Sequence, residues 1–320
     1  MTPTLNEEPL IERLCRLMPR APEQVNRVFE ADAEILAPSR LGNAHLLFST
    51  DEFSAEDCFL MQDAHALGRN IACAALSDLL ACGGRPLYYA HSLTIDTRFD
   101  GAYLTRFYEG VAEMLAQAGA YFIGGDFGRA RDWRCAVSVI GYAEKPILRS
   151  GARAGDYLYI TGPVGAGNLQ AALALHDLPE SSFSAPDFTL RIAALPDIAA
   201  HATSCIDTSD GLFNAACALA RLSDCGFALE NIPYLPSGKA LAQRLGLPLS
   251  MLAFCECGEY ELLFTSPAEL PCHNYHRIGR VTQSGRTFDG KDVAGFSARA
   301  RAHADRQSYF AEMRRQCAGL

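Results

Sequence analysis

The sequence predicts an α/β fold with some α+β character, made of two α/β domains. Three observations support this prediction. The chain has 320 residues, more than one domain usually contains. Apolar residues make up 49% and charged residues 20%, as in ordinary globular proteins. Short strand-like segments alternate with helical patterns in both halves of the chain, which is typical of α/β proteins.

The first domain is predicted to span residues 1–148. Apolar residues recur every three or four positions in its predicted helices and gather into short runs in its predicted strands. Pro19 ends the first helix, and Gly119 ends the helix that precedes it. In chain order we expect a helix over 10–18, a strand over 46–51, a helix over 64–83, a strand over 91–95, a helix over 104–118, and strands over 121–123 and 135–142.

The second domain is predicted to span residues 149–320. It opens with a polar, glycine-rich linker over 149–156. Strands and helices then alternate again, so the same class of architecture is expected. In chain order we expect a strand over 157–161, a helix over 168–176, a helix over 212–223, a strand over 260–265, and short strands over 278–281 and 292–297.

Charge and hydropathy exclude several classes of function. Lys and Arg number 28 and Asp and Glu 37, giving a net charge of −9, and no basic run is present. A general nucleic-acid binder is therefore not expected, although a local basic pocket for one small phosphorylated ligand remains open. The N-terminus has no signal-peptide pattern, and the most apolar stretch, 71–82, is too short to span a bilayer. We expect a cytoplasmic protein with neither a membrane nor a nucleic acid as partner.

The cysteine content is high, at 12 residues. Most of these cysteines stand singly in apolar runs, where a free thiol packs as a small hydrophobic group, and this implies a reducing compartment. A zinc site is the alternative, at the Cys-Glu-Cys run of 255–257 or the Cys-His-x-x-His run of 272–276. Neither spacing matches a known zinc motif well.

Two glycine-rich segments look like nucleotide-binding motifs but differ from them in detail. Segment 285–291 has the spacing of a phosphate-binding loop, but Asp292 stands where Ser or Thr is needed. Its Asp289-Gly290 pair fits a hairpin turn. Segment 162–167 follows a strand and opens a helix, but its glycine spacing is not the dinucleotide fingerprint. We expect a tight strand-to-helix turn there, with backbone amides near a phosphate as the alternative.

Single aspartates recur at the ends of apolar segments, often beside Gly, Ser or Thr. They are Asp32, Asp51, Asp78, Asp126, Asp207 and Asp210. Each one alone fits a cap or a turn. However, burying an unpaired carboxylate is costly, and the apolar helix over 64–83 has no structural need for one. Together the aspartates predict a magnesium–nucleotide site, because magnesium prefers oxygen ligands and often bridges substrate phosphates.

A series of short motifs runs through about residues 8–295. They are Leu10–Leu17, Ala31–Leu36, Ser49–Asp51, Gly68–Arg69, Ala75–Leu79, Arg85–Pro86, Gly124–Asp126, Arg149–Ala152, Gly155–Asp156, Thr161–Gly162, Ile206–Leu212 and Glu259–Thr265. In this order the motifs resemble the thiamine-monophosphate kinase family. That family belongs to a superfamily that also holds aminoimidazole ribonucleotide synthetase, selenophosphate synthetase and a hydrogenase-maturation protein. The last two motifs in combination point to the kinase branch.

The resemblance implies a homodimer in which strands of both N-terminal domains form a shared β-barrel. It implies that ATP lies in a cleft beside the barrel, with magnesium ions on its phosphates. The γ-phosphoryl group of ATP would pass directly to thiamine monophosphate, a phosphorylated small molecule, without a protein nucleophile. Carried over by position, the metal residues would be Asp32, Asp51, Asp78, Asp126 and Asp210, the catalytic residues Asp126 and Asp210, and the cofactor-binding residues Thr50, Gly124, Gly125 and Ser209.

The chain departs from the family pattern near the implied site. The departures are Ala31 for an aspartate, Asn70 for a lysine, Ala75 for an asparagine, Cys58 in a segment that lacks the family's histidine, Phe127 for a threonine, and the loss of one acidic residue before Tyr260. Two alternatives therefore stay open. One is an ATP-dependent enzyme of the same superfamily with a different acceptor, and the other is a nucleotide-binding paralogue without turnover.

Overall fold

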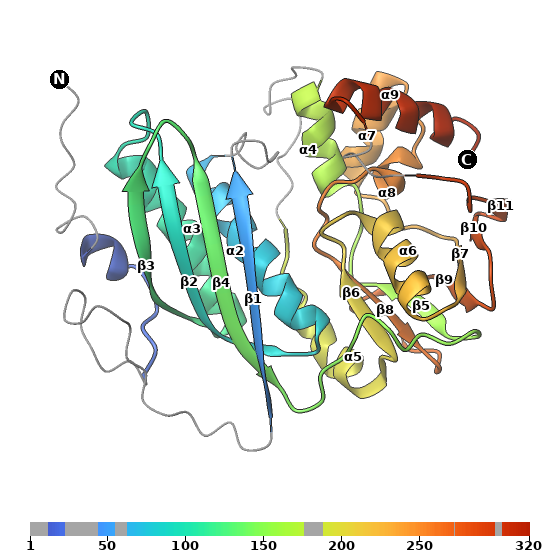
Figure 1. The fold of residues 1–320 in the computed structure, drawn as a ribbon, viewed down its shortest axis with the longest axis horizontal. Helices are drawn as coiled ribbons and strands as arrows, with labels where there is room; N and C mark the ends of the chain where they lie inside the picture. Colours follow the sequence, from blue (N-terminus) through green and yellow to red (C-terminus); the bar gives the residue numbers. More distant parts are fainter. Residues whose placement is uncertain (1–11, 23–43, 55–62, 176–187, 272, 298–302) are drawn as a thin grey trace. The chain divides into compact units, whose positions relative to one another are not determined.

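The computed structural model describes residues 12–22, 44–54, 63–175, 188–271, 273–297 and 303–320. The chain divides into two compact units. The first unit consists of Met1–Leu79 and Gly84–Lys145, and the second of Leu80–Gly83 and Pro146–Leu320. Each unit has its own sheet and its own helices (Figure 1), which confirms a mixed α/β architecture.

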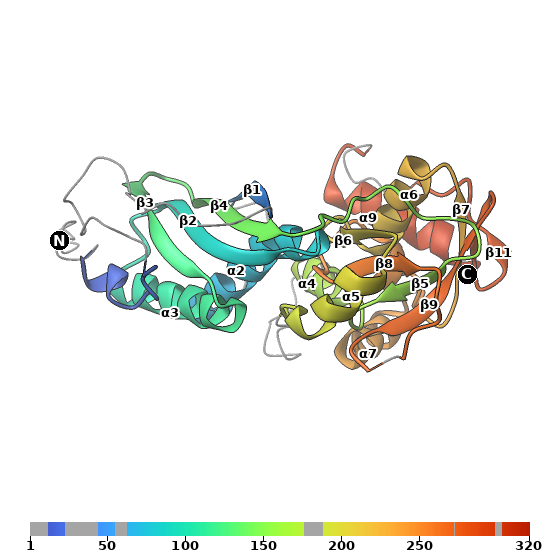
Figure 2. The same cartoon turned by 90° about the horizontal axis from the view of Figure 1, so that it is seen from below.

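The first unit is a four-stranded sheet with two long helices. Its elements are β1 (His45–Ser54), α2 (Ala64–Ala81), β2 (Arg85–Ile95), α3 (Gly101–Ala118), β3 (Tyr121–Arg129) and β4 (Arg134–Ala143). The strands lie in the order β1-β4-β2-β3, with β2 and β3 parallel and the other pairs antiparallel. Both helices lie on the same face of the sheet (Figures 1 and 2), and no described helix covers the other face.

Alternating side chains explain how this sheet packs. Cys135, Val137 and Val139 of β4 are fully buried, and the residues between them are only half-buried. On β1, Leu46 and Phe48 are each 62% exposed and lie on the face that carries no helix. The first unit therefore has one packed face and one open face that is partly apolar.

Helix α3 begins and ends at residues suited to those positions. The Asp100 side chain accepts hydrogen bonds from the amides of Ala102 and Tyr103, as an N-cap does. Gly119 adopts the left-handed conformation at the C-terminal end, which confirms the predicted stop.

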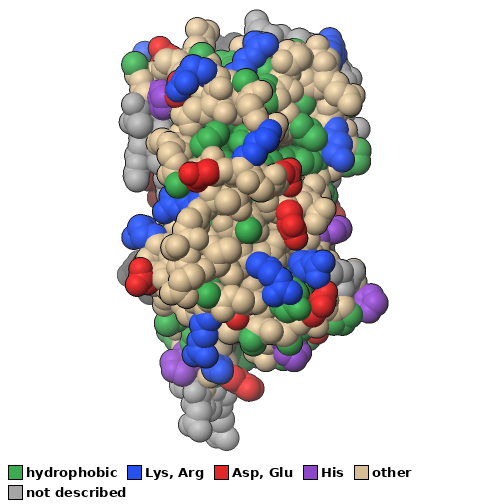
Figure 3. Space-filling model, turned by 90° about the vertical axis from the view of Figure 1, so that its right-hand side faces the viewer, with side chains coloured by type: hydrophobic (Ala, Val, Ile, Leu, Met, Phe, Trp, Pro, Cys, Tyr) green, Lys and Arg blue, Asp and Glu red, His purple; other side chains and the backbone are tan. Residues whose placement is uncertain are grey.

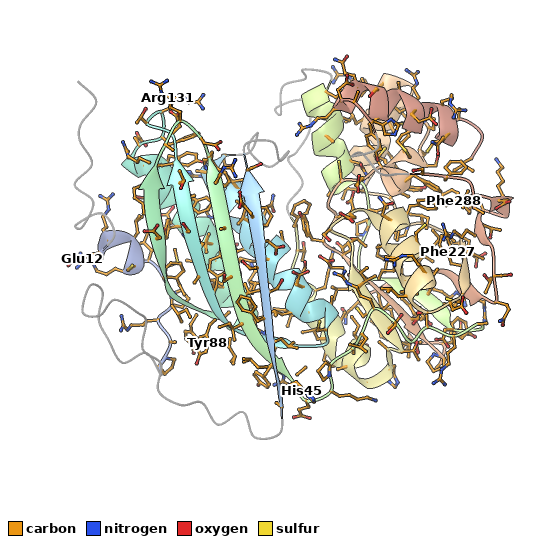
Figure 4. The ribbon with its side chains drawn as sticks, in the orientation of Figure 1. Glu12, His45, Tyr88, Arg131, Phe227 and Phe288 are labelled. Carbon is orange, nitrogen blue, oxygen red and sulfur yellow. The ribbon has the colours of Figure 1, made fainter. Side chains whose placement is uncertain are left out.

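The second unit is built around a seven-stranded sheet. The strands lie in the order β11-β10-β7-β9-β5-β8-β6, and only the β10–β7 pair is parallel. Its core includes a stacked pair of rings, Phe213 and Phe254, and side chains on neighbouring strands such as Phe227 and Phe288, labelled in Figure 4. The elements are β5 (Tyr157–Ile160), α4 (Ala166–Leu175), the 3-10 helix η3 (Ile192–Ala194), α5 (Leu195–His201), β6 (Ser204–Asp207), α6 (Leu212–Leu222), β7 (Gly226–Leu229), α7 (Pro236–Leu245), α8 (Met251–Phe254), β8 (Leu262–Ser266), β9 (His276–Thr282), β10 (Arg286–Phe288), β11 (Lys291–Asp292) and α9 (Arg306–Cys317).

Most elements predicted from the sequence are present, but several have different bounds. The strand predicted over 121–123 continues to Arg129, so the Gly-Gly-Asp motif lies inside β3 and not after it. The strand predicted over 91–95 begins at Arg85. Of the helix predicted over 10–18, the described part is helical only at 12–15.

The second unit differs more from the predictions. The hairpin turn at Asp289-Gly290 is confirmed, because β10 and β11 pair across it. The strand predicted over 292–297 is wrong beyond Asp292, where β11 ends. Elements η3, α5, β6, β7, α7, α8, β10 and α9 were not predicted. In the part of the chain that the structure describes, no helix combines the length and hydrophobicity that a membrane span requires.

Candidate functional site

Strand β1 and helix α2, which are in contact through Ser49 and Asp78, each carry one of the predicted metal residues. Ser49 and Asp51 are two positions apart on β1, so their side chains share one face of the strand. That face meets α2, because the Ser49 hydroxyl donates a 2.5 Å hydrogen bond to Oδ2 of Asp78. Asp51 and Asp78 are both half-buried. This acidic edge cluster, Ser49, Asp51 and Asp78, offers two carboxylates and a hydroxyl, which are all oxygen ligands.

Thr50 lies on the opposite face of β1. Its hydroxyl donates to the carbonyl oxygen of Val137 at 2.9 Å and accepts from Ser138 Oγ at 3.3 Å. Both partners belong to β4, so this hydroxyl stabilises the β1–β4 pair. The predicted cofactor-binding residue is therefore not directed toward the acidic edge cluster.

The Gly-Gly-Asp motif occupies the other edge of the sheet, on β3. Asp126 is exposed and lies opposite Ser92 of β2. Gly125 must lack a side chain, because a Cβ atom there would lie 1.9 Å from the carbonyl oxygen of His91. Strands β4 and β2 separate β3 from β1. Three strand spacings amount to about 14 Å, so one chain does not bring Asp126 beside Asp51.

The Asp-Thr-Ser-Asp-Gly turn links β6 to α6 in the second unit. Ser209 and Asp210 are exposed at the start of α6, and Ser209 Oγ donates to Asp207 Oδ1 at 3.0 Å. The Asn214 side-chain amide donates to the carbonyl oxygen of Asp210 at 3.1 Å. Amides at a helix N-terminus attract anions. The turn therefore presents Ser209 and Asp210 where a phosphate group could be bound.

Thr208 anchors this turn, and the sequence reasoning did not identify it. Thr208 is fully buried, and every polar group it has bonds to the segment just before β8. Its amide donates to the Glu261 carbonyl at 2.9 Å, and its hydroxyl donates to the same carbonyl at 3.1 Å. The Glu261 amide donates to Thr208 Oγ1 at 2.9 Å, and the Glu259 amide to the Thr208 carbonyl at 3.0 Å. These four bonds fix the backbone from which Ser209 and Asp210 project.

Glu259 is a buried carboxylate at the N-terminus of α4. It accepts hydrogen bonds from the amides of Gly165 and Ala166 at 2.8 and 2.7 Å. The glycine-rich segment 162–167 is therefore a tight strand-to-helix turn in which the amides of Val164, Gly165 and Ala166 are already paired. Burial raises the pKa of Glu259 to about 8, although these amide donors act in the opposite direction.

Glu261 lies next to Glu259 in sequence but pairs with different groups. Arg191 donates to it from Nε at 2.6 Å and also from Nη2, and the Thr161 hydroxyl donates at 2.7 Å. Burial raises the pKa of Glu261, and the paired Arg191 guanidinium opposes the shift. A charge this deeply buried needs such a partner.

The departures from the family pattern occupy different environments. Asn70 and Ala75 are fully buried in α2, so neither side chain is exposed to a ligand in this structure. Phe127 is half-buried on β3. Asp32, Ala31 and Cys58 lie outside the described residues.

Metal-binding groups of other kinds are not assembled in the described residues. Among these residues, no three His, Cys, Asp or Glu side chains are grouped so that they could hold a metal ion. Cys255 is buried, and burial raises the pKa of its thiol. His273 and His276 are exposed, and Cys272 lies outside the described residues.

Comparison with known proteins first gives the class. The family model described as AIR synthase related protein, N-terminal domain, matches residues 30–143. This range ends at the last residue of β4, so it covers the sheet that carries the acidic edge cluster and the Gly-Gly-Asp motif.

Individual relatives give the family. The thiamine-monophosphate kinase of Halobacterium salinarum is 34% identical over 233 residues, which cover 69% of this chain and 79% of that protein. The corresponding enzyme of Aquifex aeolicus is 28% identical over 272 residues, covering 80% of this chain and 88% of that one. The chain belongs to the thiamine-monophosphate kinase-like family of AIR synthase-related proteins, and it is thus homologous to ATP-dependent enzymes.

Solved structures agree with this assignment. The structure of AaThiL complexed with AMPPCP and TMP has a TM-score of 0.71 at 28% identity, covering 81% of this chain and 88% of that one. The hydrogenase maturation protein HypE of E. coli has a TM-score of 0.73 at 17% identity, covering 91% of this chain and 97% of that one. At that identity the second likeness concerns the fold alone.

Proposed function

We propose that the chain is an ATP- and magnesium-dependent kinase that converts thiamine monophosphate to thiamine diphosphate. The observation that carries the proposal is the acidic edge cluster, in which Ser49, two positions from Asp51 on the same face of β1, donates a hydrogen bond to Asp78. The cluster belongs to a chain whose relatives are thiamine-monophosphate kinases, and one related structure is complexed with AMPPCP and TMP.

The residues present fit a magnesium ion. Magnesium in proteins is usually held by one or two carboxylates together with substrate phosphates and water. Asp51 and Asp78 supply the carboxylates in this proposal, and the Ser49 hydroxyl supplies a further oxygen and orients Asp78. When bound, the ion would neutralise charge that builds up as two phosphate groups approach each other.

The turn before α6, in the second unit, is itself suited to a phosphate group. In this proposal the exposed Ser209 hydroxyl and the first amides of α6 bind phosphate oxygens, and Asp210 offers a carboxylate at the same turn. Thr208 holds the turn rigid through its four hydrogen bonds to residues 259–261. Rigid placement matters because phosphoryl transfer between two bound phosphates depends on position and charge, not on a protein nucleophile.

We propose a homodimer that brings Asp126 into the site. β1 and β3 are the edge strands of the four-stranded sheet, and edge strands can pair with a second copy. On β3 such pairing would involve residues beyond Phe122, which already bridges to Arg20. Leu46 and Phe48 on the open face would be buried by such pairing. Two joined sheets would form an eight-stranded barrel, with β3 of one copy next to β1 of the other. Asp126 of one copy would then approach Asp51 of the second.

A different acceptor is the second candidate. It is supported by Phe127, which stands on β3 directly after Asp126 where the family has threonine, and by the acidic residue missing before Tyr260. Both candidates fit a cytoplasmic enzyme, since every described cysteine is a free thiol, as expected in a reducing compartment.

A product assay tests the proposal. The full chain is incubated with ATP, magnesium and thiamine monophosphate, and ADP and thiamine diphosphate are quantified by chromatography. We expect equal amounts of both products. Asp78→Asn should lower the rate on the order of 100-fold or more, because the magnesium ion that would stabilise the transition state loses a charged ligand. Asp132→Asn is the matched control, since Asp132 is a half-buried carboxylate that pairs with Arg134.

Two outcomes contradict the proposal in different ways. ATP binding without thiamine diphosphate would favour the second candidate or the loss of turnover. An equal loss of rate in both variants would show that Asp78 has no special role.

A further inference from the structure

A polar pocket in the second unit has no role in the proposed phosphoryl transfer. Its volume is about 340 Å³, at the small end of the range for small-molecule sites. One wall is the segment 189–194, and the other is the segment 273–276. Thr161 and Gly162, which follow β5, also line the pocket. The Asn274 side-chain amide donates to the Ala193 carbonyl at 3.2 Å and so ties the two walls together.

Arg191 is held in a fixed position in this pocket. Its Nε and Nη2 atoms donate to the two carboxylate oxygens of Glu261, which is itself buried. Gly162 makes this arrangement possible, because a Cβ atom there would lie 2.1 Å from Nη2 of Arg191. The Arg191 side chain is 24% exposed, and its Nη1 atom has no partner among the residues that the structure describes. Arg191 therefore has spare donors that need little reordering before they bind a ligand.

The remaining polar side chains of the pocket include two imidazole groups, which can each donate a hydrogen bond. His273 and His276 lie on the wall opposite Arg191, with Asn274 between them, and Thr189 stands at the exposed end of the first wall. No Asp or Glu is among the described residues that line the pocket. The chain as a whole has a net charge of −9, and acidic and basic side chains are interspersed on the face drawn in Figure 3. The pocket is lined by one arginine and two histidines, and the only carboxylate that an ion pair joins to these residues is Glu261, which pairs with Arg191 and does not itself line the pocket in the described part of the chain.

We propose that this pocket binds the phosphate group of a small phosphorylated molecule or inorganic phosphate itself. A phosphate has three or four oxygens, so it can accept bonds from both walls at once, whereas a carboxylate has only two. Arginine in a fixed plane and imidazole groups are suited to that geometry. The proposal does not depend on the proposed kinase activity, because no residue of the acidic edge cluster or of the turn before α6 lines the pocket.

Nuclear magnetic resonance of the histidine rings tests the proposal directly. Inorganic phosphate is titrated into the full chain without nucleotide or magnesium, and the His273 and His276 ring signals are assigned from the single Gln variants. We expect both signals to shift and saturate, while the exposed His201 on α5 does not respond. A repeat with thiamine monophosphate distinguishes a monoester from free phosphate, and saturation with either probe supports the proposal.

Calorimetry with variants gives the second readout. The double variant His273→Gln/His276→Gln should bind phosphate roughly tenfold more weakly, because two donors to a charged group are altered. His201→Gln should bind as the wild type does. Arg191→Lys keeps a positive charge but loses the bidentate pairing, so this variant should also bind phosphate more weakly than the wild type. A circular dichroism spectrum shows whether the variant is folded. The proposal is overturned if neither probe shifts the two ring signals, or if the double variant binds both probes as tightly as the wild type.

Discussion

Replacing Thr208 by valine tests how the turn before α6 is held. Valine has nearly the same shape as threonine, so it leaves no cavity, but it removes the hydroxyl. Two hydrogen bonds would be lost: the one that the hydroxyl donates to the Glu261 carbonyl and the one that it accepts from the Glu261 amide. Glu261 is only 5% exposed and precedes β8, so its amide would be left buried without its partner. Such an orphan donor costs about 1–3 kcal/mol, so we expect a total loss of roughly 2–3 kcal/mol of unfolding free energy.

The chain offers a way to assign that loss to the second unit. Trp133 is the single tryptophan, is 3% exposed and lies in the first unit. Its fluorescence therefore reports on the first unit during urea denaturation, while far-ultraviolet circular dichroism reports on both. With a urea slope of about 2 kcal/mol per molar, the midpoint of the second unit should fall by roughly 1 M in Thr208→Val. The fluorescence midpoint should stay where it is in the wild type.

Thr208→Ser separates hydrogen bonding from burial. Serine keeps the hydroxyl and loses one buried methyl group, which costs about 1 kcal/mol. If the hydrogen bonds dominate, the serine variant is more stable than the valine variant. If burial dominates, the order is reversed because valine is the more apolar residue. A valine variant as stable as the wild type would refute the anchoring role of the hydroxyl.

Two further predictions concern Glu259 and Gly162. Burial raises the pKa of Glu259 from its ordinary value near 4.5 to about 8, so the folded state holds a proton that the unfolded state releases. The stability that the protonated Glu259 contributes is complete below pH 4.5 and is lost as the pH rises to 8, by up to roughly 1.4 kcal/mol per pH unit. Urea denaturation at pH 5, 6.5 and 8 measures this dependence, and Glu259→Gln should make it flatter. An unchanged pH dependence in the variant would disprove the assignment to Glu259. Gly162→Ala should lower the unfolding free energy by roughly 2–4 kcal/mol. The new methyl group would lie 2.1 Å from Nη2 of Arg191 and 2.6 Å from Oε1 of Glu261, and so would disturb this buried ion pair. Gly295→Ala is the control, since nothing lies within 4 Å of its Cβ position, and equal thermal midpoints for the two variants would contradict the prediction.

Local patterns in the sequence predict the parts of the fold that local forces decide. Gly119 ends α3 because glycine adopts the left-handed conformation without strain, and Asp289-Gly290 connects β10 to β11 for a related reason. The acidic residue in an apolar helix was also a useful signal, since Asp78 does face a polar partner on β1. These predictions need only a few neighbouring residues.

Contacts between distant segments were not predictable in this way. Thr161 and Glu261 are 100 positions apart, and Thr208 and Glu261 are 53 apart, so no local spacing connects them. The short strands β6 and β7, of four residues each, carry little periodicity, and their pairing is decided by the sheet. For the same reason the sequence could not show that Asn70 and Ala75 are buried, although both depart from the family pattern near the implied site.

If the aspartates form one site, as we propose, their placement means that the site needs the proposed dimer. Asp51 and Asp78 lie at one edge of the first sheet, and Asp126 lies on the opposite edge strand. Ser209 and Asp210 lie in the second unit, on a turn that Thr208 fixes. Each group is held by its own rigid element, but one sheet alone cannot bring its two edges together. If the proposed homodimer joins β3 to β1, a variant that blocks strand pairing should abolish activity while leaving the unfolding of the second unit unchanged. Thr208→Val should have the opposite pair of effects: it should lower the unfolding free energy of the second unit and leave dimer formation intact.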